Sequence, residues 1–448
     1  MRALAGEVAE EAWTLVVDDL SRPAFMQPAL PKADHDRLKP SAETPDALDL
    51  LPTAKNHDLK QSRAALNRPD DWVYALVSLQ TMSGYFGRGN PGIARMNSGF
   101  GNRPVVEVIH SDRPGARWRD ALARLLPHRR EVLAGPWGYR PDGLALLWAL
   151  EWDGRQSLTP DRLDPNHVEI CRRVRLIDDG GRLSFRSVPS DGMRIEAKAL
   201  NGLVGDAWLP VDLGAEGKGG KPAESKVLTV PAKGLTADLL RRLLFQDRIA
   251  LTPLQRPLPG RSGDLWLSVS VLVRGQGTTE GFHERRIPIP ARVRSSVFGA
   301  AAATDPLAGL ARSAVEVAGT VQNRVLKPAV FSFLEGAPDS INFDRDSAQA
   351  WWERFTGDFT TRWSDAYFPW LWSTPDGCDQ DERLDDWTLR LRDHALAVLH
   401  EAVRSLPDHS GRRWRIRTLS ERVFHGAFHK QFSRLNIQED RNARTAAT

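Results

Sequence analysis

Cysteine is almost absent from this chain of 448 residues, which contains only Cys171 and Cys378. Two cysteines cannot form a disulfide framework, and neither lies in a C-x-x-C pair that would indicate zinc or redox chemistry. Long apolar runs are missing too, because no stretch approaches the ~18 residues of a membrane-spanning helix. The acidic N-terminal segment lacks the pattern of a signal peptide. We therefore expect a soluble cytoplasmic protein, with no membrane partner and no bound metal.

The chain also has little excess of positive over negative charge, since 61 Lys and Arg residues nearly balance 57 Asp and Glu residues. A formal net charge of +4 is too small to indicate nucleic-acid binding by itself. Any such argument depends on where the charges lie. The length exceeds what one hydrophobic core usually fills, so we expect two domains.

The first 300 residues alternate short apolar runs with proline and glycine, which predicts one large, irregular, mixed α/β domain. Four runs indicate strands, the last by its β-branched content: Val105–His110, Leu144–Trp152, Val168–Ile177 and Leu265–Gly275. Helical patterns lie between them at Glu7–Asp19, Trp72–Met82, Trp118–Leu126 and Ala237–Phe245. The polar, glycine-rich segment Asp212–Lys226 is typical of a surface loop.

Residues 301–448 have a different pattern, with four amphipathic segments joined by short turns. These segments are Leu307–Leu334, Ser347–Trp372, Arg383–Leu406 and Leu419–Leu435. They predict a C-terminal four-helix bundle. The fold class expected for the whole chain is therefore α+β.

One stretch stands out in the first domain: "GYFGRGNPGIARMNSGFGNRP", from Gly84 to Pro104, which we call the glycine loop. It holds six glycines and three arginines but no acidic residue. Glycine lets the backbone approach another molecule closely, and arginine favours a negatively charged one. A nucleotide site, a nucleic-acid site and a structural turn are the three interpretations to separate.

The nucleotide interpretation rests on "GRGNPG" (Gly87–Gly92), which formally matches G-x-G-x-x-G. A dinucleotide site needs a strand before those glycines and a helix opening from them. Here a helical pattern precedes the motif and loop composition follows it. No P-loop, G-x-S-x-G elbow or complete metal-ligand set occurs either. The sequence therefore indicates neither an enzyme nor a cofactor.

Nucleic-acid binding suits the same loop better, because arginine can contact phosphate while exposed aromatic rings stack on bases. The competing interpretation is a long loop packed by its own aromatic side chains. The residues that suggest binding are Gly84, Gly87, Arg88, Gly89, Asn90, Arg95, Asn97, Gly99, Phe100, Gly101, Asn102 and Arg103.

Tyr74–Pro104 resembles the helix and glycine loop of the CasA family, the large subunit of the type I-E CRISPR Cascade complex. Three further segments agree in order. They are "SRPAFMQ" (Ser21–Gln27), "RGQGTTEGFHERRIPIP" (Arg274–Pro290) and "LSERVFHGAFHKQFSRL" (Leu419–Leu435). The resemblance spans residues 20 to 436. "SRPAFMQ" comes earlier than in the family, so we expect a shortened N-terminus or an edge supplied by a partner.

The resemblance implies a non-enzymatic subunit that recognises the short PAM in duplex DNA, mainly from the minor groove, and starts strand separation for guide RNA pairing. Family members use a glycine loop, a lysine finger and a polar wedge on a hairpin. The resemblance points to Lys198 for the finger and to Gln276 or Thr279, with Thr278 between them, for the wedge. Asn56 and His57 lie where members touch the guide RNA.

The implied partners are duplex target DNA, guide RNA, the backbone, small-subunit and guide-end-binding proteins of Cascade, and a recruited helicase-nuclease. Two alternatives remain at this stage. One is a nucleotide-dependent enzyme that uses the glycine loop, and the other is a DNA-binding subunit of a transposon-associated guide complex.

Overall fold

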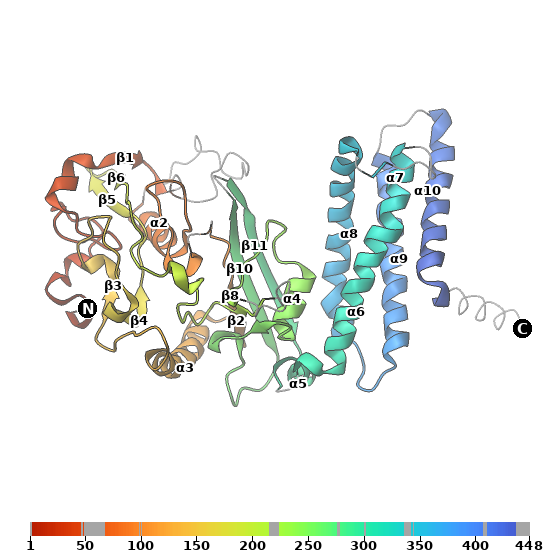
Figure 1. The fold of residues 1–448 in the computed structure, drawn as a ribbon, viewed down its shortest axis with the longest axis horizontal. Helices are drawn as coiled ribbons and strands as arrows, with labels where there is room; N and C mark the ends of the chain where they lie inside the picture. Colours follow the sequence, from red (N-terminus) through yellow and green to blue (C-terminus); the bar gives the residue numbers. More distant parts are fainter. Residues whose placement is uncertain are drawn as a thin grey trace, which may run out of the picture. The chain divides into compact units, whose positions relative to one another are not determined.

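The computed structural model describes residues 2–45, 48, 68–97, 99, 101–214, 224–275, 278–299, 302–335, 342–343, 345–405 and 410–435. The chain forms two compact units (Figure 1). The first comprises Met1–Leu235 and Arg248–Ala291, and the second comprises Thr236–Asp247 and Arg292–Thr448. The division after Ala291 lies near the boundary predicted at residue 300. The segment from Thr236 differs from that prediction, because it joins the second unit.

Small antiparallel sheets supply most of the strand structure of the first unit. One has the order β1-β6-β5 and another the order β11-β10-β2. Their strands are β1 (Lys39–Ala42), β5 (Arg173–Asp178), β6 (Leu183–Val188), β2 (Val105–Ile109), β10 (Leu265–Gly275) and β11 (Thr278–Ile289). Shorter pairings join β3 (Leu144–Leu146) to β4 (Leu163–Val168), and β7 (Val211–Asp212) to β8 (Lys226–Val227) and β9 (Ile249–Ala250).

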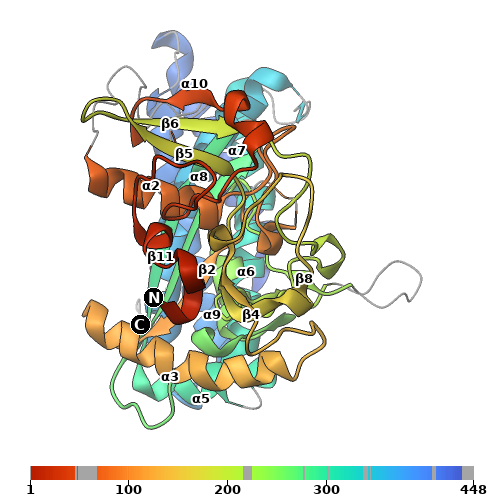
Figure 2. The ribbon, with the colours of Figure 1, turned by 90° about the vertical axis from the view of Figure 1, so that its left-hand side faces the viewer.

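Three α-helices accompany these sheets in the described part of the first unit: α1 (Arg2–Ala5), α2 (Pro69–Met82) and α3 (Pro114–Leu133). Helix α2 begins with proline at its first position and two aspartates in its first turn, both favourable at a helix N-terminus. Figure 2 shows α2 beside β5 and β6. Buried Trp72 of α2 stacks on Phe185 of β6 with 6.2 Å between ring centroids.

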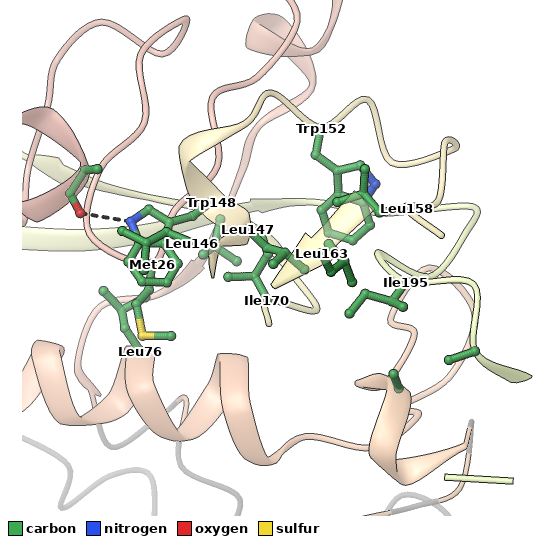
Figure 3. Close-up of a cluster of buried hydrophobic side chains, with 14 of the residues drawn as sticks. Met26, Leu76, Leu146, Leu147, Trp148, Trp152, Leu158, Leu163, Ile170 and Ile195 are labelled. Carbon is green, nitrogen blue, oxygen red and sulfur yellow. Dashed lines mark hydrogen bonds between the residues drawn. The ribbon is translucent and has the colours of Figure 1, made fainter. Parts of the chain in front are cut away.

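The hydrophobic core of the first unit gathers side chains from α2, β3, β4 and several loops. Figure 3 shows Leu76 of α2 pointing toward Met26 and Trp148. The indole Nε1 of Trp148 donates to the carbonyl of Ala12 at 2.9 Å, so a core residue also satisfies a loop backbone. This core joins segments that are far apart in the sequence.

The helix predicted over Glu7–Asp19 was wrong, because short 3₁₀ turns and extended chain occupy this range. Tertiary donors take the carbonyls that a helix would have used. Trp148 bonds to Ala12, the backbone N–H of Phe25 bonds to Thr14, and the Gln27 side chain bonds to Leu15. Packing therefore overrides the amphipathic pattern.

Two predicted strands were only partly right. The run Leu144–Trp152 is a strand only as far as Leu146 and then turns into a 3₁₀ helix. The run Val168–Ile177 is divided between the end of β4 and β5. The gap between β4 and β5 lies where the buried side chain of Gln80, in α2, bonds to the backbone.

Gln80 is fully buried and bonds to two irregular segments at once. Its Nε2 donates to the carbonyls of Met26 and Arg172 at 2.8 and 2.9 Å. Its Oε1 accepts from the N–H groups of Cys171 and Arg172 at 2.9 and 2.8 Å. One amide side chain thus replaces the ladder partners that the chain lacks between β4 and β5.

The second unit is helical. Its helices are α4 (Ala237–Leu244), α5 (Arg294–Phe298), α6 (Pro306–Thr320), α7 (Lys327–Glu335), α8 (Asp346–Trp372), α9 (Gln380–Ser405) and α10 (Ser410–Gln431). A π-helical stretch, Val321–Leu326, joins α6 to α7. Helix α9 packs on α6 and α8, while α10 packs on α7. The helical C-terminal region and the α+β class are confirmed, and the four-helix-bundle form stays a prediction.

Buried aromatic residues hold α6, α8 and α9 together. Tyr367 of α8 donates to the carbonyl of Ala311 at 2.8 Å, and Trp387 of α9 donates to that of Ala314 at 3.0 Å. Both side chains are fully buried, which agrees with a packing role for the tryptophans of this region. None of the helices in the described ranges combines the length and apolar composition that crossing a bilayer requires.

We predict that Gln80→Ala lowers the free energy of unfolding by about 3 kcal/mol, since each buried polar group left unsatisfied costs about 1–3 kcal/mol. Gln156→Ala, at an exposed position of the same unit, serves as the control and should change it by less than about 0.5 kcal/mol. Urea-induced unfolding measures both variants. Equal losses in the two would contradict the role assigned to Gln80.

Candidate nucleic-acid interface

The glycine loop begins with a tight, exposed turn. The backbone N–H of Phe86 donates to the carbonyl of Asn90 at 2.9 Å, and that of Asn90 donates to Gly87 at 3.1 Å. Gly87 and Gly89 have φ values of 81° and 84°, a region that other residues rarely adopt. The turn from Phe86 to Asn90, which we call the glycine turn, therefore depends on these two glycines.

The two arms below the glycine turn lie against each other with almost no side chains between them. The N–H of Ile93 donates to the carbonyl of Ser83 at 3.0 Å. A Cβ atom at Gly92 would lie 2.6 Å from the backbone of Gly84, so only glycine fits. The arms form a thin, closely paired base.

A buried arginine ties both arms to the domain. Arg172, whose backbone bonds to Gln80, donates to the carbonyl of Gly84 at 3.2 Å and also to that of Pro91. The Ser190 N–H donates to the carbonyl of Gly89 at 2.9 Å, and buried Arg173 in turn donates to the Ser190 hydroxyl at 3.2 Å. The glycine turn is thus fixed at its base and near its tip.

The side chains around the glycine turn point outward and suit contact with a strand of nucleic acid. Arg88 is exposed, and within the described ranges it makes no hydrogen bond or ion pair. Tyr85 and Phe86 are 38% and 47% exposed, so part of each ring is accessible to a ligand. The charge and the rings are accessible, and the binding role of this half of the loop stays a prediction.

The other two arginines of the glycine loop point into the protein instead. Arg95 pairs with Asp206 at 3.2 Å and donates to the carbonyl of Thr81 at 2.8 Å. Arg103 is buried and bonds to the Val227 carbonyl and the Thr229 hydroxyl, and burial lowers its pKa. Their expected contact with phosphate is therefore replaced by a role in holding the loop.

The second half of the glycine loop is held by a half-buried carboxyl group. Both oxygens of Glu169 accept from the N–H of Ala94, at 3.0 and 2.9 Å, where a 3₁₀ helix (Ala94–Met96) begins. Burial raises the pKa of Glu169 to about 8, although the Ala94 N–H and Arg95 act in the opposite direction. This half is therefore fixed before any ligand is present.

The segment that carries Lys198 lies against this second half. The amide of Asn97 donates to Asn201 at 3.4 Å, and a Cβ atom at Gly202 would lie 2.7 Å from the carbonyl of Arg95. Lys198 is exposed at the start of a 3₁₀ helix three residues before Asn201. The structure thus brings Lys198 and the glycine loop into one region.

The hairpin of β10 and β11 extends toward the same region by topology. Strand β2 follows directly after the glycine loop, and its first residue, Val105, pairs with Ser270 of β10. Because this pairing is antiparallel, the rest of β10 runs on past the point where the loop enters the sheet. Its end pairs Gly275 with Thr278 and Arg274 with Thr279.

The remaining predicted residues fall into two groups. Gly99, Gly101 and Asn102 belong to the described second half, where the carbonyl of Asn102 accepts from Val230 at 2.9 Å. Four predicted residues lie outside the described ones: Asn56, His57, Phe100 and Gln276.

Sequence reasoning missed the residues that support the loop. Arg172, Glu169 and Ser190 come from segments 65 or more residues further along the chain. The run "ICRRVR" gave the only available signal, since consecutive arginines are uncommon inside an apolar strand pattern. Cys171 in that run is buried, and burial raises its pKa to about 11, so its thiol is poorly suited to act as a nucleophile.

The loop lacks the geometry of a dinucleotide site. Helix α2, rather than a strand, precedes Gly87–Gly92, and only the three-residue 3₁₀ helix follows. A pyrophosphate site of the Rossmann type requires the N-terminus of a full helix at that point. Among the described residues, no group of three or more His, Cys, Asp or Glu side chains could hold a metal ion.

Comparison with known proteins gives a match by structure. No protein-family model matches this sequence, and no curated protein matches it either. A crystal structure of CasA from Thermus thermophilus aligns with a TM-score of 0.58 and 15% identity over 94% of this chain and 80% of that chain. The CRISPR-associated protein Cse1 from Acidimicrobium ferrooxidans aligns with a TM-score of 0.54 and 16% identity over 91% and 78%.

A further structure of Thermus thermophilus CasA (Cse1) gives a TM-score of 0.52 and 15% identity over 92% of this chain and 79% of that chain. Similarity at this level of identity concerns the fold. The resemblance inferred from four sequence segments is confirmed in that sense, and the chain has a CasA-like fold.

Proposed function

We propose that this protein is the non-catalytic large subunit of a CRISPR Cascade complex that recognises the PAM in duplex DNA and starts strand separation. The exposed glycine turn carries the proposal. It presents Gly87, Arg88 and Gly89 on a base that Arg172 holds rigidly. The CasA-like fold supports the same function, because the aligned proteins are described as CasA and as CRISPR-associated Cse1.

The minor groove of B-DNA is only ~6 Å wide, so a backbone without side chains can enter where an ordinary loop cannot. At the glycine turn, only Arg88 separates the two glycines, and its positive charge suits the phosphates that line the groove. Lys198 extends this interface as the lysine finger, because its segment contacts the glycine loop through the hydrogen bond from Asn97 to Asn201.

The β10–β11 hairpin supplies the wedge in this proposal. Its two strands continue beyond their last pairing with β2, and in the described part of this extension they pair with each other. Gln276 and Thr279 are the candidates for parting the strands of DNA. The complex would also contain guide RNA, contacted through Asn56 and His57, together with the other Cascade subunits, and would recruit a helicase-nuclease.

The first test is assembly. This chain is expressed with a guide RNA and with the backbone, small-subunit and guide-end-binding proteins encoded in the same genome. We expect it to co-purify with them and to confer binding to duplex DNA that carries the PAM. A chain that stays outside the complex, or that binds ATP or NAD tightly with no effect on DNA, would overturn the proposal.

We predict that Gly87→Asp weakens binding of this complex to PAM-containing DNA at least ~10-fold, because it adds a negative charge at the glycine turn. Gly180→Asp, in the β5–β6 turn, is a matched control. Both glycines are exposed at positive φ (81° and 70°), and neither would meet another atom within 4 Å. The two variants thus share the same backbone strain and charge change, so equal DNA affinity in a gel-shift titration would refute the role of the glycine turn.

We also predict that Arg88→Ala reduces the slope of log affinity against log salt concentration by about 0.9, the value for one lost phosphate contact. Arg130→Ala removes an exposed arginine from α3 and should leave the slope unchanged. Fluorescence anisotropy over a range of salt concentrations measures both. An unchanged slope for Arg88→Ala would exclude a phosphate contact at the glycine turn.

A further inference from the structure

A cavity of about 540 Å³ lies in the first unit, behind the glycine loop. Thr81 and Met82 from the end of α2 and Ile93 and Arg95 from the loop form one wall. The opposite side comes from α3, from the end of β4 and from residues 204–208. This volume is within the range of pockets that hold small organic ligands.

Most of the cavity surface is apolar. Val105, Val132, Val168 and Val204 contribute branched side chains, and Trp208 contributes an aromatic one. Exposed Asn166 marks the place where the cavity reaches the protein surface. Apolar walls with a few polar groups are typical of sites for neutral, partly aromatic molecules.

His167 offers a hydrogen-bond acceptor to the cavity. Its Nδ1 lies 2.9 Å from the carbonyl of Asp164, and since a carbonyl can only accept, this nitrogen carries the proton. Burial lowers the pKa of His167, which keeps the ring neutral and leaves Nε2 as an acceptor. No group in the described part of the chain bonds to Nε2. The imidazole ring of His167 packs against the ring of Tyr139, with 5.7 Å between the centroids, and this contact fixes the orientation of the imidazole.

Glu169 adds a donor to the same cavity. With a pKa of about 8, Glu169 keeps its proton at neutral pH and can donate it to a ligand, while its oxygens accept from the N–H of Ala94. The charge of Arg95 is already balanced by Asp206 at 3.2 Å. The cavity is therefore polar at one place and nearly neutral overall.

This combination excludes several ligand classes. A phosphate or carboxylate would need an unpaired cation, and the Arg95–Asp206 pair does not provide one. A lipid chain would bury Nε2 of His167 and the O–H of Glu169 without partners. A neutral nitrogen heterocycle fits both requirements, because a nucleobase carries a donor and an acceptor side by side on its edge and has two apolar faces.

We propose that this cavity binds a neutral heterocycle of the nucleobase type, held by Glu169 and His167 between apolar walls. The inference goes beyond the proposed DNA-binding role and does not depend on it, because binding can be measured on the isolated full-length chain. Ile93 and Arg95 belong to both the cavity and the glycine loop, so an occupied cavity would also stabilise that loop.

The test uses adenosine, guanosine, cytidine and uridine as probes in isothermal titration calorimetry. We expect at least one to bind with a dissociation constant of roughly 0.01–1 mM, as suits a ligand of this size. His167→Phe keeps the ring volume but removes the acceptor, and should weaken binding at least ~10-fold. His35→Phe is the matched control, because His35 also bonds to a carbonyl, that of Leu30, but lies outside the cavity.

A second variant distinguishes a blocked cavity from a misfolded protein. Val204→Phe places a larger apolar side chain in the cavity, so it should abolish binding while the variant keeps the thermal transition of the native protein. The absence of binding for all four nucleosides, or equal binding by wild type, His167→Phe and Val204→Phe, would overturn the proposal.

The heterocycle could be a free nucleoside or a base turned out of a nucleic-acid strand, and a further measurement separates the two. A single-stranded oligonucleotide carrying 2-aminopurine reports entry of its base into an apolar site by a change in fluorescence. A change that Val204→Phe removes indicates a base within a strand. Binding of nucleosides without such a change indicates a free ligand.

We predict that adenosine binding weakens as the pH rises through about 8, because ionised Glu169 loses its donor. Burial raises this pKa, while the Ala94 N–H, Arg95 and Arg194 lower it. Between pH 4.5 and about pH 8 the folded protein also binds more protons than the unfolded chain. Its free energy of unfolding therefore falls as the pH rises through this range. Glu169→Gln keeps a donor that does not titrate and should bind adenosine equally at pH 6 and pH 9. A pH dependence retained in this variant would contradict the assignment to Glu169.

Discussion

Backbone carbonyls outside regular strands and helices need donors inside the first unit, and buried arginine side chains supply many of them. Arg175 bonds to the carbonyls of Val17 and Arg22, and Arg194 bonds to those of Leu147 and Leu150. Burial lowers the pKa of both arginines to about 10, which still leaves them charged. Each guanidinium bonds to several carbonyl acceptors at once, which offsets part of its desolvation cost and leaves fewer carbonyls of the core unsatisfied. This constraint explains how a domain with small sheets keeps one fold.

The candidate interface follows from the same constraint. Arg172 joins the two arms of the glycine loop, and Arg173 acts through Ser190 on Gly89. Arg103 anchors the loop where it enters the sheet. Most arginines of this region are therefore structural, and the contrast makes exposed Arg88 informative. In a chain with a net charge of only +4, one exposed guanidinium at a glycine turn is a more specific indication of an anionic partner than the overall composition is.

Local patterns were enough to predict the elements whose residue pattern agrees with their tertiary surroundings. Helix α2 and strand β10 were found with nearly the observed bounds, because their apolar periodicity and β-branched content agree with the tertiary structure. The segment Glu7–Asp19 shows the limit, since distant side chains take its carbonyls. The glycine turn was visible as composition. Its supports were not, because the pairing of Arg172 with Gly84 and of Glu169 with Ala94 depends on contacts between separated segments.

The way in which the glycine turn is tied down has a consequence for binding energetics. A glycine-rich segment has the largest backbone entropy of any sequence, and a loose one would lose that entropy each time it met its ligand. Here the carbonyls of Gly84 and Gly89 are already bonded in the free chain, so most of that loss has occurred during folding. The turn combines the narrow profile of glycine with a preorganised backbone. Less of the free energy gained from contacts is then lost to ordering the loop, so more of it contributes to affinity.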